Sequence, residues 1–335
     1  MEILAETGTD AYLTLLEELI VQGERSAPRG MPTREIRDVT VRIEDAVHAH
    51  VLGTTRKVNR RIAAVETIQL LGGISNLAQL DAVSSNVFSK YADGGRLRGA
   101  YGPRTASQLV GVVKLLERDP DTRQAVVTVW NGYEQLGSCK DIPCTQAFQF
   151  FVRRGKLHMR VAMRSSDIFL GVPYDWMMFS RLQLIVAAHL GLEPGTYTHV
   201  AGSQHLYDTN LADSERIIEV GAFNGSGFDV PPPLLGKDDP AYLGGSIQGG
   251  QLARSQYLAI KLGLGKVGEP EGQAETDAVH LSEDLDWYLS HVPQLEGQGL
   301  CRDCRYVIDD SELIIPHADD VHYRICRECE MRRNM

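Results

Sequence analysis

The chain has 335 residues, of which 43% are hydrophobic and 23% charged, as is typical of a globular protein with one large domain or two modest ones. Its formal net charge of −10 excludes a basic surface spread over the whole chain, the usual sign of a nucleic-acid-binding protein. No apolar run is as long as a membrane helix and no secretory signal is recognisable, so we expect a cytoplasmic protein with no membrane partner.

The first third of the chain predicts helices and a strand. Apolar spacing predicts a helix over residues 11–23, and alternation of polar and apolar residues predicts a strand over 37–43. A second helix is expected over 61–73, ended by Gly72 and Gly73, and a third over 104–118.

The middle of the chain predicts a sheet with more helices. We expect strands over 124–130, 145–153 and 156–164, the last two joined by a turn at Gly155. A long apolar helix over 174–191, a strand over 195–204 and a helix over 211–221 follow. This mixture indicates an α+β domain built around a large sheet.

The character of the sequence changes after about residue 235, where a proline-rich segment begins. We therefore expect a main domain over residues 1–240 and a divergent extension of helix and loop over 241–300. A separate small module is expected over 301–335.

The residues with recognisable chemistry gather between 141 and 210. Cys144 follows a proline at the start of a predicted strand, and the next strand ends in Arg164, Ser165 and Asp167. Arginine with a neighbouring hydroxyl suits a phosphate group, and a thiol beside arginine has a lowered pKa and is nucleophilic. Each signal alone is weak, since a lone cysteine is usually a small core residue. Arginines also gather elsewhere, at Arg25, Arg29 and Arg34, at Arg60 and Arg61, and at Arg123.

Several motifs together resemble the thymidylate synthase family in order and spacing. They are the proline–cysteine pair, RSSDIFLGVP, LGLEPGTYTH and HLY, with VETIQLLGG, AYG and DPDTRQAVVTVWN further upstream. The resemblance covers roughly residues 10–240. It implies a thymidylate synthase-like α+β fold, with a large mixed β-sheet flanked by helices, and a catalytic domain over residues 1–240.

The resemblance also implies a reaction on a pyrimidine nucleoside monophosphate. The Cys144 thiolate adds to carbon 6 of the ring, which makes carbon 5 nucleophilic towards the one-carbon unit of the co-substrate 5,10-methylenetetrahydrofolate. Arg164 favours the thiolate. Glu66 orders water and moves protons at the base, and Tyr101 lies near the proton on carbon 5.

A set of binding residues is implied in the same way, each matched to one part of the ligands. The phosphate ligands are Arg29, Arg123, Arg164 and Ser165, the ribose ligands are His205 and Tyr207, and the folate residues are Asp167, Phe88 and Tyr91. Arg123 is expected to come from the second subunit of a homodimer.

The most informative departure from the family is Asp175, which stands where thymidylate synthase has asparagine. An ionised carboxylate only accepts hydrogen bonds, so it suits the amino group of cytosine and repels O4 of uracil. Family members with aspartate here resemble deoxycytidylate (dCMP) 5-hydroxymethyltransferases, known from bacteriophages that modify their DNA; for a viral protein the compartment would be the host cytoplasm. Neutral drift in a uracil enzyme is the alternative.

Other departures concern the phosphate and folate sites. Gln124 replaces the second arginine of a usual pair, and Thr145 replaces a histidine. Phe88 and Tyr91 replace two tryptophans that line the folate, and a reshaped lining could admit water. Water capture gives a hydroxymethyl group, whereas hydride transfer from the folate gives a methyl group.

The tail contains two CxxC pairs, Cys301 with Cys304 and Cys326 with Cys329. Paired CxxC turns are typical of a structural Zn²⁺ site, which is closed and stabilises rather than catalyses. His317 or His322 could replace one cysteine. The tail could instead bind a partner or nucleic acid, which its arginines support modestly, namely Arg302, Arg305, Arg324, Arg327, Arg332 and Arg333.

Of three alternatives to a dCMP hydroxymethyltransferase, the first two remain open at this stage. The first is a methyltransferase on the same base, a CMP enzyme or a dUMP enzyme. The second is a non-catalytic nucleotide or RNA binder on the same fold. The third, a zinc-dependent nucleobase deaminase, requires a His-x-Glu motif, which the sequence lacks.

Overall fold

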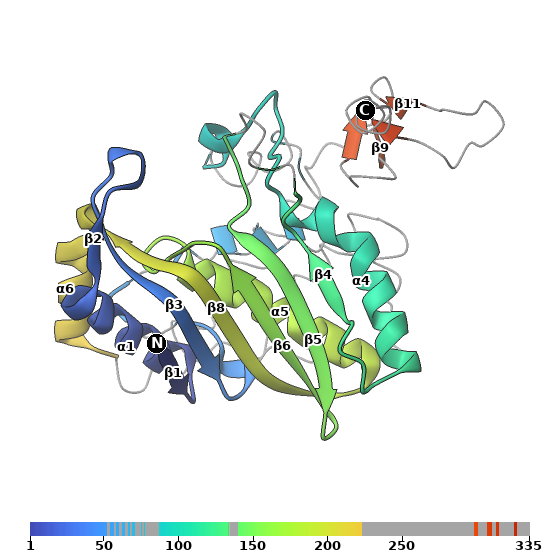
Figure 1. Ribbon diagram of the computed structural model, residues 1–335, viewed down its shortest axis with the longest axis horizontal. Helices are drawn as coiled ribbons and strands as arrows, with labels where there is room; N and C mark the ends of the chain where they lie inside the picture. Colours follow the sequence, from blue (N-terminus) through green and yellow to red (C-terminus); the bar gives the residue numbers. More distant parts are fainter. Residues whose placement is uncertain are drawn as a thin grey trace, which may run out of the picture.

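A mixed β-sheet with helices packed against it forms the main part of the structure, a computed structural model (Figure 1). The structure describes residues 1–51, 54–56, 58–59, 62–63, 66–67, 69–70, 75, 77, 87–132, 134, 140–222, 298–300, 307–309, 313–314 and 325–326. Its main helices are α1 (Gly8–Gln22), α4 (Tyr101–Arg118), α5 (Val172–Leu190) and α6 (Leu211–Val220). Short 3-10 turns are η1 (Pro28–Gly30), η2 (Ala46–His48), η3 (Ser89–Tyr91) and η5 (Asp208–Asn210).

The strands of the main sheet lie in the order β1-β3-β8-β6-β5-β4. Their bounds are β1 (Glu2–Ala5), β3 (Thr33–Ile43), β8 (Glu193–Tyr207), β6 (Lys156–Met163), β5 (Thr145–Arg153) and β4 (Val126–Thr128). β2 (Glu24–Ser26) pairs with β3, and β7 (Ser166–Asp167) pairs with β8. Three pairs of this sheet are parallel, namely β1 with β3, β6 with β8 and β7 with β8. Its other pairs are antiparallel. The expected mixed sheet with flanking helices is therefore confirmed.

Most elements expected from periodicity are present, with longer bounds in several cases. The strand expected over 37–43 begins at Thr33, and the strand expected over 195–204 extends from Glu193 to Tyr207. The turn between β5 and β6 has positive φ at Arg154 (55°) and Gly155 (73°), the backbone that a two-residue hairpin requires. In the predicted helix 61–73, the described residues 62–63, 66–67 and 69–70 are helical.

Helix α5 forms the centre of the core, behind the sheet in the view of Figure 1. It is apolar on nearly all sides, as expected of a helix enclosed by other elements. Its Trp176 and Phe179 are fully buried, and the Phe179 ring lies 5.1 Å from the ring of Phe148 on β5. Every second residue of β5, counted from Phe148, therefore points towards α5.

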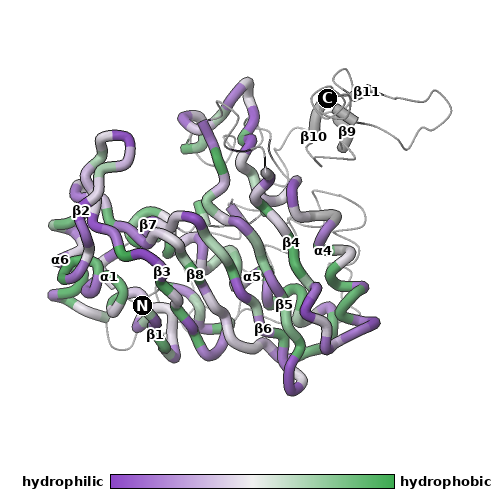
Figure 2. Tube along the Cα trace, in the orientation of Figure 1, coloured by the Kyte–Doolittle hydropathy of each residue, from purple (hydrophilic) through white to green (hydrophobic). Residues whose placement is uncertain are grey.

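The opposite face of the sheet is only partly covered by the described residues. On β5 the side chains of Ala147, Gln149 and Phe151 are partly exposed, alternating with buried Phe148 and Phe150. β6 and β8 show the same alternation. In Figure 2 the turn that joins β5 and β6 is hydrophilic, in contrast to the largely hydrophobic strand β5. We call the partly exposed side of β4, β5, β6 and β8 the open face.

The extension and the tail lie mostly outside the described residues. Of the predicted extension 241–300, only β9 (Gln298–Leu300) is described, and it pairs with β10 (Val307–Asp309). β11 (Leu313–Ile314) pairs with β12 (Ile325–Cys326). The helix expected within this extension lies outside the described residues, and so does the predicted domain boundary at residue 240. No described helix has the length and hydrophobicity that crossing a membrane requires.

Candidate active site

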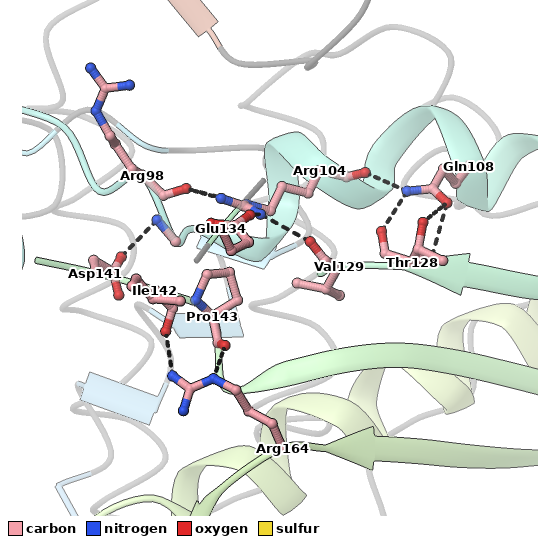
Figure 3. Close-up of polar contacts among 11 residues, drawn as sticks. Arg98, Arg104, Gln108, Thr128, Val129, Glu134, Asp141, Ile142, Pro143 and Arg164 are labelled. Atoms are coloured by element: carbon pink, nitrogen blue, oxygen red, sulfur yellow. Dashed lines mark hydrogen bonds and ion pairs between the residues drawn. The ribbon is translucent and has the colours of Figure 1, made fainter. Parts of the chain in front are cut away.

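Cys144 lies in the loop that leads into β5, and Arg164 lies directly after β6 on the neighbouring strand. The Arg164 backbone N–H donates to the Cys144 carbonyl (2.9 Å), and its guanidinium donates to the carbonyls of Pro143 (2.9 Å) and Ile142 (3.1 Å) (Figure 3). The guanidinium also lies 3.7 Å from the Cys144 sulfur. The expected contact between thiol and arginine is therefore present, because the two antiparallel strands start and end at the same edge.

The pKa of the Cys144 thiol is raised, contrary to the expectation of a lowered value. Burial raises it most, Arg164 opposes this, and Asp175, Asp141 and Asp167 raise it further. The guanidinium is shared with two carbonyl oxygens, so it does not outweigh burial together with three carboxyl groups. Sequence reasoning considered the arginine but could not see the carboxyls that the fold brings to the thiol.

Two of the predicted carboxyl groups, Asp175 and Glu66, have a strongly raised pKa. Asp175 lies in the first turn of α5; burial raises its pKa to about 7, and Asp167 adds to the effect. Burial also raises the pKa of Glu66 to about 8, with a contribution from Asp175. Glu66 therefore keeps its proton at neutral pH and Asp175 is partly protonated there, a pattern common where carboxyls act as acids and bases.

Tyr101 is the first residue of α4 and completes this group. Its ring stacks on Phe179 with the centroids 6.0 Å apart. Burial raises its pKa well above the usual value; Asp175 and Cys144 raise it too, and a hydrogen bond with Thr145 opposes them. Thr145 is itself buried, with its hydroxyl 2.9 Å from the sulfur of Met163. We call Cys144, Tyr101, Glu66, Asp175 and Arg164 the cysteine cluster.

The predicted ribose and phosphate residues Ser165, His205 and Tyr207 lie together beside the cluster. The Ser165 hydroxyl is 3.4 Å from Nδ1 of His205, whose ring meets that of Tyr207 edge-on at 5.1 Å. Burial lowers the pKa of His205, while the Asp167 charge raises it. The pairing of β7 with β8 produces this arrangement, since it places Asp167 opposite His205.

Asp167 organises the start of the turn that leads into α5. One of its carboxylate oxygens accepts the N–H groups of Phe169 and Leu170, both at 2.8 Å. Arg56, which sequence reasoning did not select, donates to the Phe169 carbonyl (3.1 Å) and lies 4.7 Å from the centre of its ring. Nothing in the local sequence around Arg56 distinguishes it from a surface arginine.

Two of the predicted phosphate ligands lie apart from the cysteine cluster, and two of the predicted folate residues differ from each other in burial. Arg29 is exposed in η1 with a φ of 55°, and Arg123 is exposed before β4. No contact within the described part of the chain joins either guanidinium to the cysteine cluster. Phe88 is buried, whereas Tyr91 is 43% exposed with the Lys90 ammonium 4.7 Å from the centre of its ring.

The zinc prediction falls mostly outside the described residues. Cys301, Cys304 and Cys329 are not described, and Cys326 is the last residue of β12. Within the described ranges, no group of three or more His, Cys, Asp or Glu side chains could hold a metal ion. The structural zinc therefore stays a prediction.

Sequence comparison agrees with this arrangement of residues. Residues 10–224, more than half of the chain, match the thymidylate synthase family. The match includes the cysteine cluster, the β7–β8 pair and α5. Members of that family use methylenetetrahydrofolate and transfer its one-carbon unit to a pyrimidine nucleotide. The chain belongs to the thymidylate synthase family.

Proposed function

We propose that the protein transfers the one-carbon unit to carbon 5 of a cytosine nucleotide and releases 5-hydroxymethyl-dCMP. The observation that supports this most is the Asp175 carboxyl, whose charge acts on Glu66, Tyr101 and Cys144 together. The Asp175 carboxyl is therefore close to the groups that would react with the pyrimidine ring, so it can select the base.

Hydrogen-bond chemistry makes Asp175 a cytosine selector. Cytosine has an acceptor at N3 and a donor amino group at N4. A neutral carboxyl donates to N3 and accepts from the amino group, and an ionised one still accepts from the amino group. Uracil has a donor at N3 and an acceptor at O4, so an ionised carboxylate repels O4. Discrimination against uracil is therefore greatest above a pH of about 7, the pKa of Asp175.

The cysteine cluster has the groups that the reaction needs. In our proposal the Cys144 sulfur bonds to carbon 6, and the electron pair gained by carbon 5 attacks the one-carbon unit. Tyr101 removes the proton from carbon 5, and Glu66, protonated at neutral pH, exchanges protons with the base. Arg164 holds the loop of the thiol and, with Ser165, binds the phosphate. Methylenetetrahydrofolate would supply the carbon unit and leave as tetrahydrofolate when the carbon 5 proton is removed. Water would then add to the resulting exocyclic methylene group while the bond from carbon 6 to the sulfur breaks, which frees Cys144 and the hydroxymethyl product.

The remaining roles follow the resemblance. His205 and Tyr207 bind the ribose, and Asp167, Phe88 and Tyr91 face the folate. Arg29 completes the phosphate site. The exposure of Tyr91 is compatible with water reaching the intermediate, which favours a hydroxymethyl over a methyl product.

A homodimer is part of the proposal, because Arg123 is exposed beside the open face. The Arg123 carbonyl accepts from Nε2 of Gln149 (3.0 Å), which lies on that face. Val126 on β4 is 40% exposed on the same side, and its neighbours Ala147 and Gln149 on β5 are uncharged, whereas Arg160 on β6 is exposed beside Gln149. A second copy that covers this face could receive Arg123 in its phosphate site.

Mass spectrometry of the products formed from dCMP, CMP and dUMP, each with methylenetetrahydrofolate, tests the function. We expect dCMP to gain a hydroxymethyl group, with no dihydrofolate formed. A methyl product, formed together with an equal amount of dihydrofolate, would show that the protein is a methyltransferase and not a hydroxymethyltransferase. Product from dUMP alone would reject the choice of base. Failure to release tritium from carbon 5 of all three nucleotides would indicate a binding protein.

A further inference from the structure

The loop that leads to Cys144 is joined to the loop that leads to Tyr101 by hydrogen bonds at several points. The Asp141 carboxylate accepts the Gly99 N–H at 3.0 Å, as Figure 3 shows. One residue earlier, the Lys140 N–H donates to the Asp93 carboxylate at 2.8 Å, and its ammonium lies 3.3 Å from the Ala92 carbonyl. Segments 92–99 and 140–141 therefore lie side by side.

Both loops end at residues of the cysteine cluster. Cys144 comes three residues after Asp141, and Tyr101 comes two residues after Gly99 at the start of α4. On the far side of the Cys144 loop, the Arg164 guanidinium bonds to the next two carbonyls, Ile142 and Pro143. The thiol is thus held by Arg164 on one side and linked to the Tyr101 segment through Asp141 on the other.

The Asp141 carboxylate packs closely against Gly99. A Cβ atom at position 99 would lie 2.6 Å from that carboxylate, inside van der Waals distance, so the Asp141 side chain would have to move away from the amide. Burial raises the pKa of Asp141, whereas the Gly99 N–H and Arg104 lower it, and the charges of Asp93 and Glu134 raise it. The fold therefore keeps a partly buried carboxyl in a specific contact with one backbone amide.

We propose that Asp141 is a positioning residue that fixes the distance between the Cys144 sulfur and the Tyr101 hydroxyl. The inference rests on the proposed function, in which sulfur and phenol act on adjacent carbons of one ring. Reactions of this kind are sensitive to placement, since an error of about 1 Å can cost roughly a hundredfold in rate. Asp141 itself need not touch the substrate.

Two variants separate the position of Asp141 from its charge. Asp141→Ala removes both the charge and the acceptor for Gly99. Asp141→Asn removes the same charge but keeps an amide oxygen that can accept the N–H. Asp45→Ala is the matched control, because Asp45 accepts the Val47 N–H at 2.9 Å in η2, away from the cluster.

We expect Asp141→Ala to lower kcat by about 10- to 100-fold with little change in the KM for nucleotide. The deuterium isotope effect with dCMP labelled at carbon 5 should increase, because a displaced phenol makes proton removal slower. Asp141→Asn should restore kcat and the isotope effect to nearly wild-type values, and Asp45→Ala should change neither. Equal kcat and isotope effects in Asp141→Ala and wild type would overturn the proposal, and so would equal losses in the Ala and Asn variants.

A second measurement requires no turnover. The alkylation rate of Cys144 by iodoacetamide, followed by peptide mass spectrometry, should be several-fold higher in Asp141→Ala than in Asp141→Asn, because the released loop exposes the partly buried thiol. Equal rates would overturn the proposal. If the wild-type protein converts none of the nucleotides, the proposed function fails while this comparison still decides the role of Asp141.

Discussion

At the scale of single residues, the four acidic groups of the cysteine cluster all have a raised pKa. Asp175 acts on Glu66, Tyr101 and Cys144, and Asp167 acts on Asp175. Burial is the largest cause in each case, because it disfavours every charged form. The unliganded protein therefore holds several protons that a bound substrate can exchange.

The first prediction concerns the choice of base. Asp175→Asn replaces a carboxyl with an amide of almost the same shape, which can donate to O4 of uracil and accept from N3. We expect the ratio of kcat/KM for dCMP over dUMP to fall by about 10²- to 10⁴-fold. Competition assays with both nucleotides in one reaction measure this ratio, and an unchanged ratio would remove the argument for cytosine.

The second prediction concerns stability and pH, through Glu66. Its pKa is about 8 in the folded protein against an ordinary 4.5, so the unfolded chain loses this proton first as the pH rises. The free energy of unfolding should therefore decrease between pH 4.5 and about 8, and Asp175 should act in the same direction up to about 7.

Glu66→Gln removes the ionisation and should flatten this dependence. At pH 9 the variant should be more stable than wild type by an amount on the order of a few kcal/mol. At pH 4 the difference should be much smaller. Urea unfolding at several pH values measures it, and a difference that does not vary with pH would contradict the raised pKa.

At the scale of elements, α1 shows how one helix face secures the β1–β3 edge of the sheet. Thr7 caps its first turn by accepting the Asp10 N–H at 3.2 Å. The helix then buries one apolar stripe, formed by Ala11, Tyr12, Leu15, Leu16 and Leu19. That stripe packs against β1 and β3.

The third prediction tests the α1 stripe with a matched pair. Leu15 is fully buried, so Leu15→Ala should cost about 2–5 kcal/mol of unfolding free energy. Val21 in the same helix is 73% exposed, so Val21→Ala should change the stability by less than about 0.5 kcal/mol. Urea unfolding of both variants provides the comparison, and similar costs would show that the stripe is not the contact surface.

At the scale of the whole molecule, the open face and the exposed Arg123 predict a shared active site. The fourth prediction is that Arg123→Ala and Cys144→Ser are each inactive alone, whereas their mixture after exchange of subunits recovers about a quarter of wild-type activity. One site of each mixed dimer would then contain an intact Cys144 and the partner's intact Arg123.

Controls for the mixture follow from the same geometry. Cys144→Ser mixed with Glu66→Gln should stay inactive, because both residues belong to the site of one subunit, and each mixed site would lack one of them. Sedimentation should show a dimer for every variant. A monomeric wild-type protein, or a mixture without recovery, would contradict the shared site.

The fifth prediction concerns the tail. Metal analysis of the full chain should find one zinc ion per subunit, and Cys301→Ser together with Cys304→Ser should abolish it. Because a site of four thiolates is closed, we expect zinc removal to lower thermal stability without a change in the kcat of the folded protein. Loss of activity in proportion to lost zinc would give the tail a part in catalysis.

The sequence by itself determined the elements and the family. The alternation of β5 and β6, the turn at Gly155 and the apolar helix α5 follow from local periodicity, because each depends on neighbouring residues only. The motifs around Cys144, Arg164 and His205 determined the family, because their order and spacing can be read directly from the sequence.

Only the tertiary structure decided the protonation of the site and the contacts that hold it. The charge of Asp175 acts on Glu66, more than 100 positions away, and the bond from Gly99 to Asp141 joins residues 42 positions apart. The pKa of Cys144 is raised by its burial and by carboxyl groups that the fold brings to it. Burial and charge depend on distance through space, and periodicity contains no information about such distances. The short strands β1 and β7 were missed for a similar reason, since both form by pairing with a strand distant in sequence.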